Sequence, residues 1–372
     1  MKDRKIIKTI MEAKVIKKTM TMIILIFSAL TLVSCVDEEA LLETTVDVVD
    51  FVGDTVTVPK NPQKVAVVAR SAVDMLVAFG LGDKLDGVYK TIFDNPWASY
   101  LYPNIETYYS YEYNENYETF YSRGVDLIIA PEKYIAEDLR SKGLNAITVS
   151  QYGTPTYEEV LFRLPDLIMQ IWDDTSVHAK VVDWKNEFLL VKNKILIELE
   201  SFDDIYETLY YIRGDKYGGL NYTETKGSKI ETYGRYLKLK FLGEYFDHNN
   251  RPSEEAVLNL NPTYIITGGI YQNQIIEELY SNEVWNKLDA VKNDNVFNIG
   301  IGFVMFEQTS VEEIIFLADL ANKVYPDIFD FDVHTMLKEI ISKYFDVSLT
   351  DTEVNYMLAG LDPYGKSLVS SS

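Results

Sequence analysis

Arginine and tyrosine side chains follow several predicted strands, where they could hold a ligand. Arg70 comes directly after the apolar run 65–69, and Arg213 comes directly after the run 209–212. An arginine presents a fixed fork of N–H donors that suits carboxylate and related oxygen atoms. Tyr217 and Tyr271 come a few residues after predicted strands, and tyrosine combines a flat apolar face with one hydroxyl group. These four residues are candidates for binding a bulky ligand with several oxygen atoms.

A tyrosine-rich segment adds two further candidates. Eight of the 27 tyrosines fall between Tyr100 and Tyr121. Among them we select Tyr111 and Tyr113 because they stand just before Asn116-Tyr117-Glu118. Other polar or aromatic residues after predicted strands are Tyr89, Lys90, Tyr134, Tyr152 and Phe303. A half-buried surface role is the alternative for any single tyrosine, and direct ligation of ferric iron or heme by a phenolate stays open.

The sequence contains no recognisable catalytic or metal-binding motif. Its three histidines, His178, His248 and His334, are far apart, which disfavours a bare zinc site. It also lacks a GxSxG motif, a Walker loop, a GxGxxG motif and a cysteine nucleophile. We therefore expect no enzymatic activity and no cofactor, and we assign no metal ligands.

Short apolar strands alternate with helical patterns along the chain. Examples are the runs 65–69, 85–89 and 126–130, and a second series begins at 209–212. Such alternation predicts βαβ units, whose ligands bind beyond the carboxyl ends of the strands. Between the two series, residues 174–200 contain no glycine or proline and have apolar residues at steps of three or four, which predicts one long helix. The predicted fold is α/β, with two Rossmann-like lobes, central and mainly parallel sheets, and one long linking α-helix.

The two halves of the chain contain a related segment. Residues 118–130 align without a gap on residues 255–267, at an offset of 137. Each copy has the pattern of a short helix, a turn and a buried strand. The match supports two lobes of related architecture.

The N-terminal residues have the features of a lipoprotein signal. Residues 1–34 carry seven basic and two acidic side chains, a net charge of +5, and the rest of the chain carries −27. The apolar stretch 20–33 is shorter than the roughly 20 residues of a membrane-spanning helix. It ends at Leu32-Val33-Ser34-Cys35, which resembles a bacterial lipobox and implies lipidation of Cys35, the single cysteine. A buried core cysteine is the alternative, and Met11 or Met20 could be the true start.

Composition, charge and length indicate the class of protein, its partners and its division into segments. A hydrophobic fraction of 47% with 25% charged residues is typical of a globular protein. The net charge of −22 disfavours nucleic acid as a partner. The predicted divisions are a signal peptide (1–34), a tether outside the core (35–52), an N-terminal lobe (53–172), the linking helix (173–203), a C-terminal lobe (204–361) and a tail (362–372).

Several segments together resemble the substrate-binding proteins of ABC importers for iron complexes and cobalamin. The match comprises Val56–Val68 with Ala78–Val88, Asn116-Tyr117-Glu118 with Val125–Ala130, and Ser253-Glu254-Glu255 with Leu260–Ile266. These segments span most of residues 53–330 in the family's order. The resemblance implies a rigid pair of lobes, with a ligand in the cleft between them.

The same resemblance implies the partners. A ferric siderophore is our preferred ligand because its own oxygens can fill the iron coordination shell, and heme or cobalamin is the alternative. Glu118 and Glu255 match the family's glutamates that meet arginines on the permease, and an ATPase drives the permease. A helix-dipole role is the alternative for both glutamates. We expect a monomer, anchored outside the cytoplasm to the cell membrane. A chelatase-like enzyme and a surface adhesin stay open as other classes.

Overall fold

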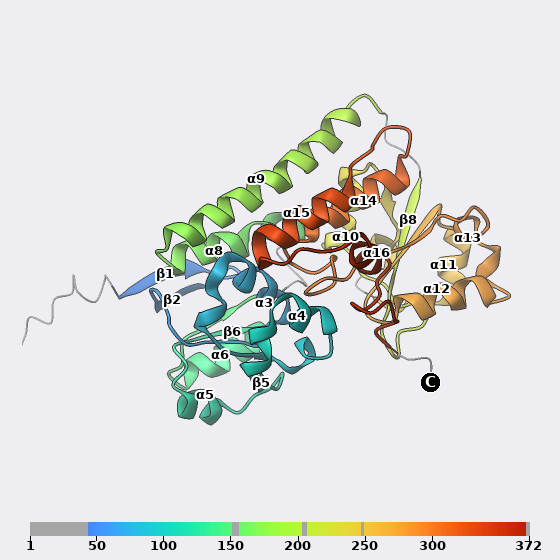
Figure 1. Cartoon of the computed structure of the whole chain (residues 1–372). Coiled ribbons are helices and arrows are strands. Elements are labelled where there is room, and N and C mark those ends of the chain that lie inside the picture. Colours follow the sequence, from blue (N-terminus) through green and yellow to red (C-terminus); the bar gives the residue numbers. More distant parts are fainter. Residues whose placement is uncertain (1–43, 151–155, 203–206, 247–248, 370–372) are drawn as a thin grey trace, which may run out of the picture. The chain divides into compact units, whose positions relative to one another are not determined.

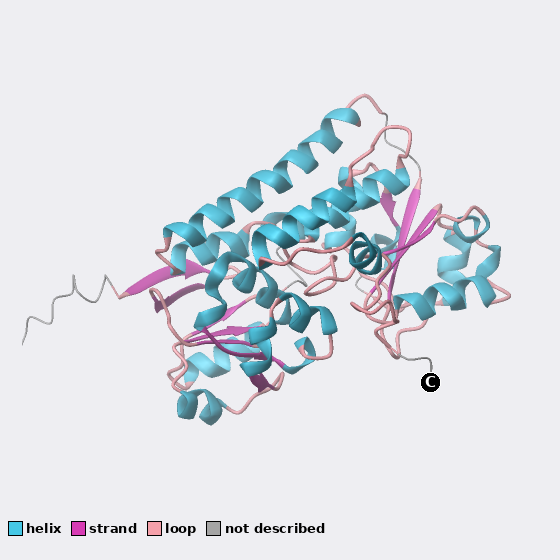
Figure 2. Cartoon of the chain, in the orientation of Figure 1, coloured by secondary structure: helices cyan, strands magenta, loops and turns pink. Residues whose placement is uncertain are grey.

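The computed structural model describes residues 44–150, 156–202, 207–246 and 249–369 (Figure 1). Two separate parallel sheets occur in these ranges, and helices lie on both sides of each sheet (Figure 2). This arrangement confirms the predicted α/β fold with two lobes. Among the described residues, no helix has both the length and the apolar character needed to cross a membrane.

The N-terminal lobe contains a five-stranded sheet in the order β5-β4-β3-β6-β7, with every neighbouring pair parallel. Its strands are β3 (Val65–Val67), β4 (Leu85–Tyr89), β5 (Tyr109–Tyr111), β6 (Leu127–Ala130) and β7 (Ala146–Thr148). Its helices include α3 (Arg70–Leu76), α4 (Pro96–Leu101), α5 (Tyr117–Arg123) and α6 (Lys133–Ser141). All residues of β3 and β6 are buried, as expected for apolar runs that are covered on both faces.

The C-terminal lobe contains a four-stranded parallel sheet in the order β11-β10-β8-β9. Its strands are β8 (Thr208–Arg213), β9 (Lys240–Phe241), β10 (Tyr264–Gly268) and β11 (Val296–Asn298). Its helices include α10 (Lys229–Tyr236), α11 (Glu254–Leu260), α12 (Gln272–Ser281), α13 (Asp289–Lys292), α14 (Glu313–Val324), α15 (Val333–Phe345) and α16 (Asp351–Leu358). The helix expected at 230–242 is shorter than predicted, because the left-handed backbone of Lys238 ends it and β9 follows.

The predicted linking helix is present as α9 (Thr175–Glu198), after α7 (Tyr157–Val160) and α8 (Arg163–Ile171). Asp174 caps its first turn by accepting hydrogen bonds from the Ser176 and Val177 backbone N–H groups. The residues at the predicted apolar spacing are buried: Val177, Val181, Trp184, Phe188, Val191 and Ile195. One face of this 24-residue helix therefore packs against the rest of the fold.

The end of the predicted tether belongs to the fold, which corrects our expectation for that part. Residues 35–52 overlap β1 (Thr45–Val49), and Val48 and Phe51 are buried. The Asp50 carboxylate accepts a hydrogen bond from the Thr148 backbone N–H at 3.1 Å, at the end of β7. The stretch contributes to the core because its alternating side chains fit a half-buried strand. Cys35 and the signal segment lie outside the described residues.

The sequence repeat corresponds to a repeated structural unit. Helix α5 and strand β6 begin at Tyr117 and Leu127, and α11 and β10 begin at Glu254 and Tyr264, again at an offset of 137. The residue after each helix, Gly124 or Asn261, has a left-handed backbone that ends the helix. The two lobes therefore share a helix-turn-strand unit.

Polar contacts join the lobes away from their sheets. The Val311 backbone N–H donates to the Asp74 carboxylate at 2.7 Å, and the Trp184 indole N–H donates to the Val311 carbonyl at 3.1 Å. In addition, Asn95 Nδ2 donates to the carbonyls of Gly302 and Phe303 at 2.9 and 3.0 Å. The segment 302–311 of the C-terminal lobe is thus bonded to α3, to α9 and to the start of α4.

Candidate functional site

A cavity of about 470 Å³, which we call cavity A, lies at the carboxyl ends of β8 and β10. Arg213 is the last residue of β8, and Gly269 to Tyr271 follow β10. The charged and aromatic side chains on its wall are Arg70, Tyr157, Tyr211, Arg213, Asp215, Lys216, Tyr217, Glu224, Lys229, Tyr271 and Glu307. Both lobes contribute to it, since Arg70 begins α3 in the N-terminal lobe.

A second cavity of about 250 Å³, cavity B, lies at the carboxyl ends of the N-terminal strands. Its wall comes from the segments after β3, β4, β5, β6 and β7, and includes Val68, Tyr89, Thr91, Tyr113, Glu132 and Val149. Arg70, Arg213 and Gln308 line both cavities, so A and B are neighbours. Ligands of open parallel sheets bind at this edge, and both sheets present it here.

Five of the six candidate ligand-binding residues lie at these cavities. Arg70 and Arg213 line both, Tyr217 and Tyr271 line cavity A, and Tyr113 lines cavity B. The Arg70 guanidinium lies where cavities A and B adjoin, and its Nη2 atom contacts the sulfur of Met305 at 3.5 Å. The residues that follow parallel strands are brought together because those strands all end at the same edge of a sheet.

Tyr111 lies outside both cavities, and this corrects its selection. The side chain is fully buried, it stacks on Phe120, and its hydroxyl donates to Asp86 at 2.6 Å. Tyr111 is the last residue of β5 and packs against Phe120 of α5, whereas Tyr113 lies in the loop after the strand. The tyrosine-rich pattern could not distinguish this core position from Tyr113, two residues later in the loop.

Of the other residues that follow predicted strands, some line a cavity and some do not. Tyr89 lines cavity B, whereas the Lys90 ammonium pairs with Glu112 at 2.6 Å. Phe303 is buried and stacks on Phe345, and Tyr134 is exposed and lines neither cavity. Tyr152 and His248 lie outside the described residues. A position directly after a strand therefore indicates a cavity residue in some cases but not in all.

Several charged and polar residues of the cavity wall were not predicted from the sequence. Glu224, Lys229, Glu307 and Gln308 line cavity A but do not directly follow strands. Glu307 had a usable signal, because it directly follows the apolar segment Ile301 to Phe306. Glu224 and Lys229 lie in polar segments and gave no such signal.

Two carboxyl groups on the wall of cavity A lack strong partners. Glu224 Oε1 lies 3.6 Å from Arg213 Nη1, which is too long for a hydrogen bond. Glu307 Oε1 accepts a hydrogen bond from the Gly269 backbone N–H at 2.8 Å, where Gly269 has a φ of +76°. Burial raises the pKa of both carboxyl groups, and the positive charge of Arg213 opposes the shift. Both groups therefore hold protons more readily than exposed glutamates.

Lys229 is fixed by a network behind the cavity wall. Its ammonium lies 2.9 Å from Glu313 Oε2 and donates to the Gln308 carbonyl at 2.7 Å. Glu313 also accepts hydrogen bonds from the hydroxyls of Tyr157 and Tyr233. Burial lowers the pKa of Lys229, and Glu313 opposes that shift. This network attaches α7 to α10 and α14 beside cavity A.

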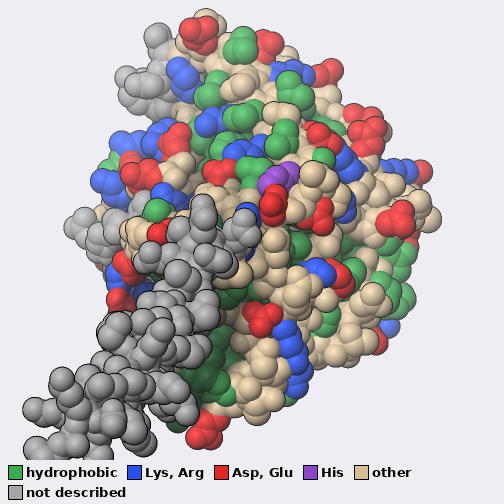
Figure 3. All heavy atoms as spheres, turned by 90° about the vertical axis from the view of Figure 1, so that its left-hand side faces the viewer, with side chains coloured by type: hydrophobic (Ala, Val, Ile, Leu, Met, Phe, Trp, Pro, Cys, Tyr) green, Lys and Arg blue, Asp and Glu red, His purple; other side chains and the backbone are tan. Residues whose placement is uncertain are grey.

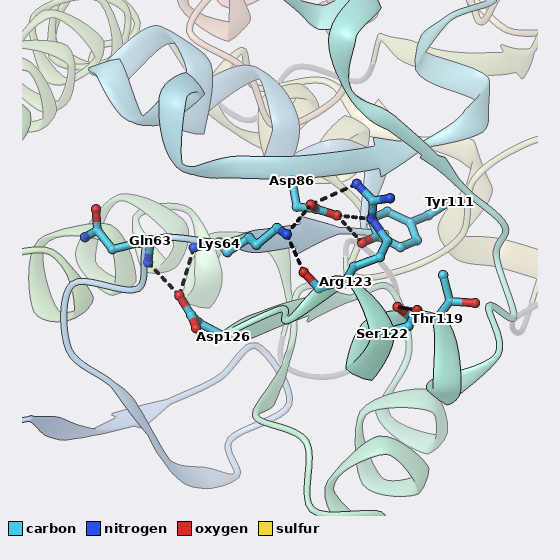
Figure 4. A network of polar contacts seen from close by, with 8 residues as sticks. All are labelled: Gln63, Lys64, Asp86, Tyr111, Thr119, Ser122, Arg123 and Asp126. Atoms are coloured by element: carbon cyan, nitrogen blue, oxygen red, sulfur yellow. Dashed lines mark hydrogen bonds and ion pairs between the residues drawn. The ribbon is translucent and has the colours of Figure 1, made fainter.

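A contrasting carboxylate in the N-terminal lobe is fully bonded. Asp86 accepts hydrogen bonds from Arg123 Nε and Nη2 at 2.5 and 2.9 Å and from the Tyr111 hydroxyl, with Lys64 Nζ at 3.3 Å (Figure 4). Burial opposes ionisation, but these donors hold the pKa of Asp86 below its usual value. Such complete pairing is typical of a structural charge, and the carboxyl groups at cavity A differ from it.

The described residues contain no cluster of three or more His, Cys, Asp or Glu side chains that could hold a metal ion. Cavity A instead combines N–H donors, phenol rings and carboxyl groups. This donor set can contact a ligand through many weak interactions without forming metal bonds.

Comparison with known proteins agrees with this architecture. No model of a known protein family matches the sequence. The chain is 23% identical over 303 residues to YvrC of Bacillus subtilis, an uncharacterised ABC transporter substrate-binding lipoprotein, and the match covers 75% of this chain and 85% of YvrC. A periplasmic solute-binding protein from Veillonella parvula superimposes with a TM-score of 0.65 at 18% identity, covering 84% of this chain and 97% of that one.

The chain has the fold of ABC transporter solute-binding proteins. The molybdate-binding protein MolA of Haemophilus influenzae superimposes with a TM-score of 0.69 at 15% identity, covering 82% and 99% of the two chains. CeuE of Helicobacter pylori, in a complex with nickel and histidine, gives 0.66 at 15% identity, covering 84% and 99%. These findings confirm the resemblance noted in the sequence, since YvrC is a substrate-binding lipoprotein and MolA is a molybdate-binding protein.

The two predicted docking residues occupy equivalent positions in this solute-binding fold. Glu118 and Glu255 are each the second residue of a short helix, α5 and α11, and both are exposed. Asn116 and Ser253 cap these helices by accepting backbone N–H hydrogen bonds. Neither glutamate forms an ion pair with any other described residue, so both carboxylates are accessible for an external partner.

Proposed function

We propose that this chain is the substrate-binding component of an ABC importer and that it captures a metal chelate between its lobes. The observation that carries the proposal is the pair of neighbouring cavities at the carboxyl ends of both sheets, with Arg70 and Arg213 lining both. The 470 Å³ of cavity A lies within the usual range of about 300 to 1,000 Å³ for small-molecule sites.

A ferric siderophore is the preferred ligand, and heme or a corrinoid is the alternative. Arg70 and Arg213 can donate to the metal-bound oxygens of a chelate, and Tyr113, Tyr217 and Tyr271 can pack on its organic frame. A chelate that fills its own coordination shell needs no ligand atom from the protein. The wall residues supply hydrogen bonds and flat contacts, which are the interactions that such a complex requires.

The proposed partners are a permease with its ATPase and a membrane surface. Glu118 and Glu255 would meet basic side chains on the permease, and a lipid on Cys35 would keep the protein at the membrane. We propose a monomer outside the cytoplasm, with no nucleic acid partner.

Binding can be tested with a panel of chelates. Tyrosine and tryptophan fluorescence of the purified protein is followed during titration with a ferric tricatecholate, a ferric trihydroxamate, heme and cobalamin. Saturable binding of one of them is expected. Slow turnover of a ligand would instead indicate an enzyme, and the absence of any binding would contradict the proposal.

The arginine pair provides the matching variants. Arg213→Ala should weaken binding of the chelate by about 1.5 to 3 kcal/mol, the usual range for a hydrogen bond from a charged group. Arg70→Ala should act in the same direction. Arg235→Ala is the control, since Arg235 lies on α10, pairs with Glu158 at the surface and lines neither cavity. An unchanged dissociation constant in both cavity variants would remove these arginines from the site.

A further inference from the structure

The carboxyl groups of Glu224 and Glu307 each have an oxygen that no donor among the described residues reaches within hydrogen-bond distance. The Glu224 side chain is 16% exposed, it lines cavity A, and its contact with Arg213 at 3.6 Å is too long for a hydrogen bond. By contrast, Asp86 receives hydrogen bonds from two side chains in the same protein. Glu224 thus offers acceptor atoms to whatever fills the cavity.

Glu307 shows the same shortage of donors. One oxygen, Oε1, is bonded to the Gly269 N–H, while Oε2 is shielded from solvent and has no hydrogen-bond partner among the described residues. A buried acceptor without a donor destabilises the empty site by the cost of removing it from water. The terminal torsion of a glutamate is soft, so a small rotation can present an oxygen to the cavity. A ligand N–H group would supply the missing donor.

The charges around cavity A do not favour a polyanion. Four cationic side chains line it, Arg70, Arg213, Lys216 and Lys229, together with the acidic Asp215, Glu224 and Glu307. The Lys229 charge is matched from behind by Glu313 at 2.9 Å. The site is therefore close to neutral when its acids are ionised, whereas a polyanion would require a clear excess of positive charge.

Building on the proposed function, we infer that Glu224 and Glu307 are specificity-determining residues that accept hydrogen bonds from a cationic N–H donor, such as a primary ammonium group, on the bound chelate. Arg70 and Arg213 then contact the oxygens around the metal, and the two glutamates contact the positively charged end. Charge-assisted hydrogen bonds of this kind are stronger than those between neutral groups. Burial raises the pKa of both carboxyl groups, and a cationic group placed beside them would favour their ionised forms.

A matched pair of chelates tests this inference. The first probe is a ferric linear trihydroxamate with one free ammonium group, and the second is the same complex with that nitrogen acetylated. Acetylation removes the charge and leaves the iron environment unchanged. The wild-type protein should bind the ammonium form about 10-fold more tightly, or more, as expected for a charged hydrogen bond.

Isosteric variants assign the preference to its residues. Glu224→Gln and Glu307→Gln should each reduce the ratio of the two dissociation constants toward one, and each is checked for folding by circular dichroism. If one variant fails to fold, the other carries the test. Glu277→Gln on α12 is the control, because this exposed residue changes the same charge away from both cavities.

The outcomes separate this inference from the proposed function. Equal affinities of the wild-type protein for both probes, or a preference that persists in both variants, would overturn the role of the glutamates while leaving chelate binding intact. Binding of a ferric tricatecholate but of neither hydroxamate would do the same. Failure of every chelate in the panel to bind would overturn the proposed function as well.

Discussion

At the scale of single residues, Asp86 illustrates how the N-terminal lobe satisfies a buried charge. Its side chain is 3% exposed and accepts hydrogen bonds from Arg123 and Tyr111, which lie on α5 and β5 (Figure 4). The carboxylate therefore ties β4 to two neighbouring elements. Removing one partner of such a pair leaves the others buried without their counter-charge.

Asp86→Asn should lower the free energy of unfolding by about 2 to 4 kcal/mol at neutral pH. The folded pKa of Asp86 is depressed below the ordinary 3.8, so its stabilisation is complete above that value and is lost as the pH falls through the folded pKa. The difference between wild type and variant should thus shrink in acid. Urea unfolding at several pH values measures it.

The surface carboxylate Asp138 provides the comparison. It pairs with Lys142 one turn along α6 and its side chain is 61% exposed. Asp138→Asn should change stability by no more than about 0.5 kcal/mol. If Asp86→Asn lowered the free energy of unfolding by no more than this, the contacts of Asp86 with Arg123 and Tyr111 would not be important for stability.

At the scale of elements, two buried carboxyl groups join α3 to the segment before α14. Asp74 and Glu312 are both fully buried, and one oxygen of each carboxyl group, Asp74 Oδ2 and Glu312 Oε2, has no hydrogen-bond partner among the described residues. Val311 N–H donates to Asp74, and Phe303 N–H donates to Glu312 at 3.1 Å. Burial raises the pKa of both groups, and the negative charge of Glu312 raises the pKa of Asp74 further.

Asp74→Asn should make the stability of the protein less sensitive to a rise in pH. Because the folded pKa of Asp74 is raised, its stabilisation is complete below the ordinary 3.8 and is lost as the pH rises toward the folded pKa, with a slope of up to about 1.4 kcal/mol per pH unit. Asparagine keeps the acceptor for Val311 N–H and does not ionise. Thermal unfolding from acidic to alkaline pH provides the measurement, since the loss begins just above the ordinary 3.8, and parallel curves for the two proteins would contradict this effect of Asp74.

At the scale of the whole molecule, the net charge alone does not mark the docking surface. Acidic and basic side chains are interspersed on the face shown in Figure 3, despite the formal charge of −22. Glu118 and Glu255 stand out because the repeat places each one in the first turn of an equivalent helix. A carboxylate there stabilises its own helix, by about 0.3 to 1 kcal/mol, whether or not it has a partner.

The double variant Glu118→Ala and Glu255→Ala should keep normal ligand affinity but lose uptake and stimulation of the ATPase in reconstituted vesicles. Contacts between charged groups steer association and are screened by salt, so the defect of each single variant relative to the wild type should be largest at low salt and should shrink as salt is added. Replacing Glu277 and Glu278 of α12, which are also exposed, is the control. Full transport by the double variant would leave only the helix-dipole role.

The predicted membrane attachment would depend on Cys35. Cys35→Ala should leave the described fold intact and abolish partitioning into the detergent phase, because the sequence has no second cysteine to accept a lipid. Detergent extraction of cells that express each form provides the measurement. A variant with a cleaved signal that still partitions with detergent would show that the lipobox interpretation is wrong.

The sequence by itself determined most of the strands and helices, but not β5 or β9, and it also determined the linking helix and the edge of each sheet where a ligand could bind. These features depend on local periodicity, as at Val177 to Ile195 in α9, and on the rule that parallel strands end at a common edge. Only the tertiary structure decided which side chains reach that edge. Tyr111 faces the core and Tyr113 faces cavity B, while Glu224 and Glu307 come from loops whose paths are set by long-range packing. Periodicity records burial along one element, whereas a cavity depends on how distant elements meet.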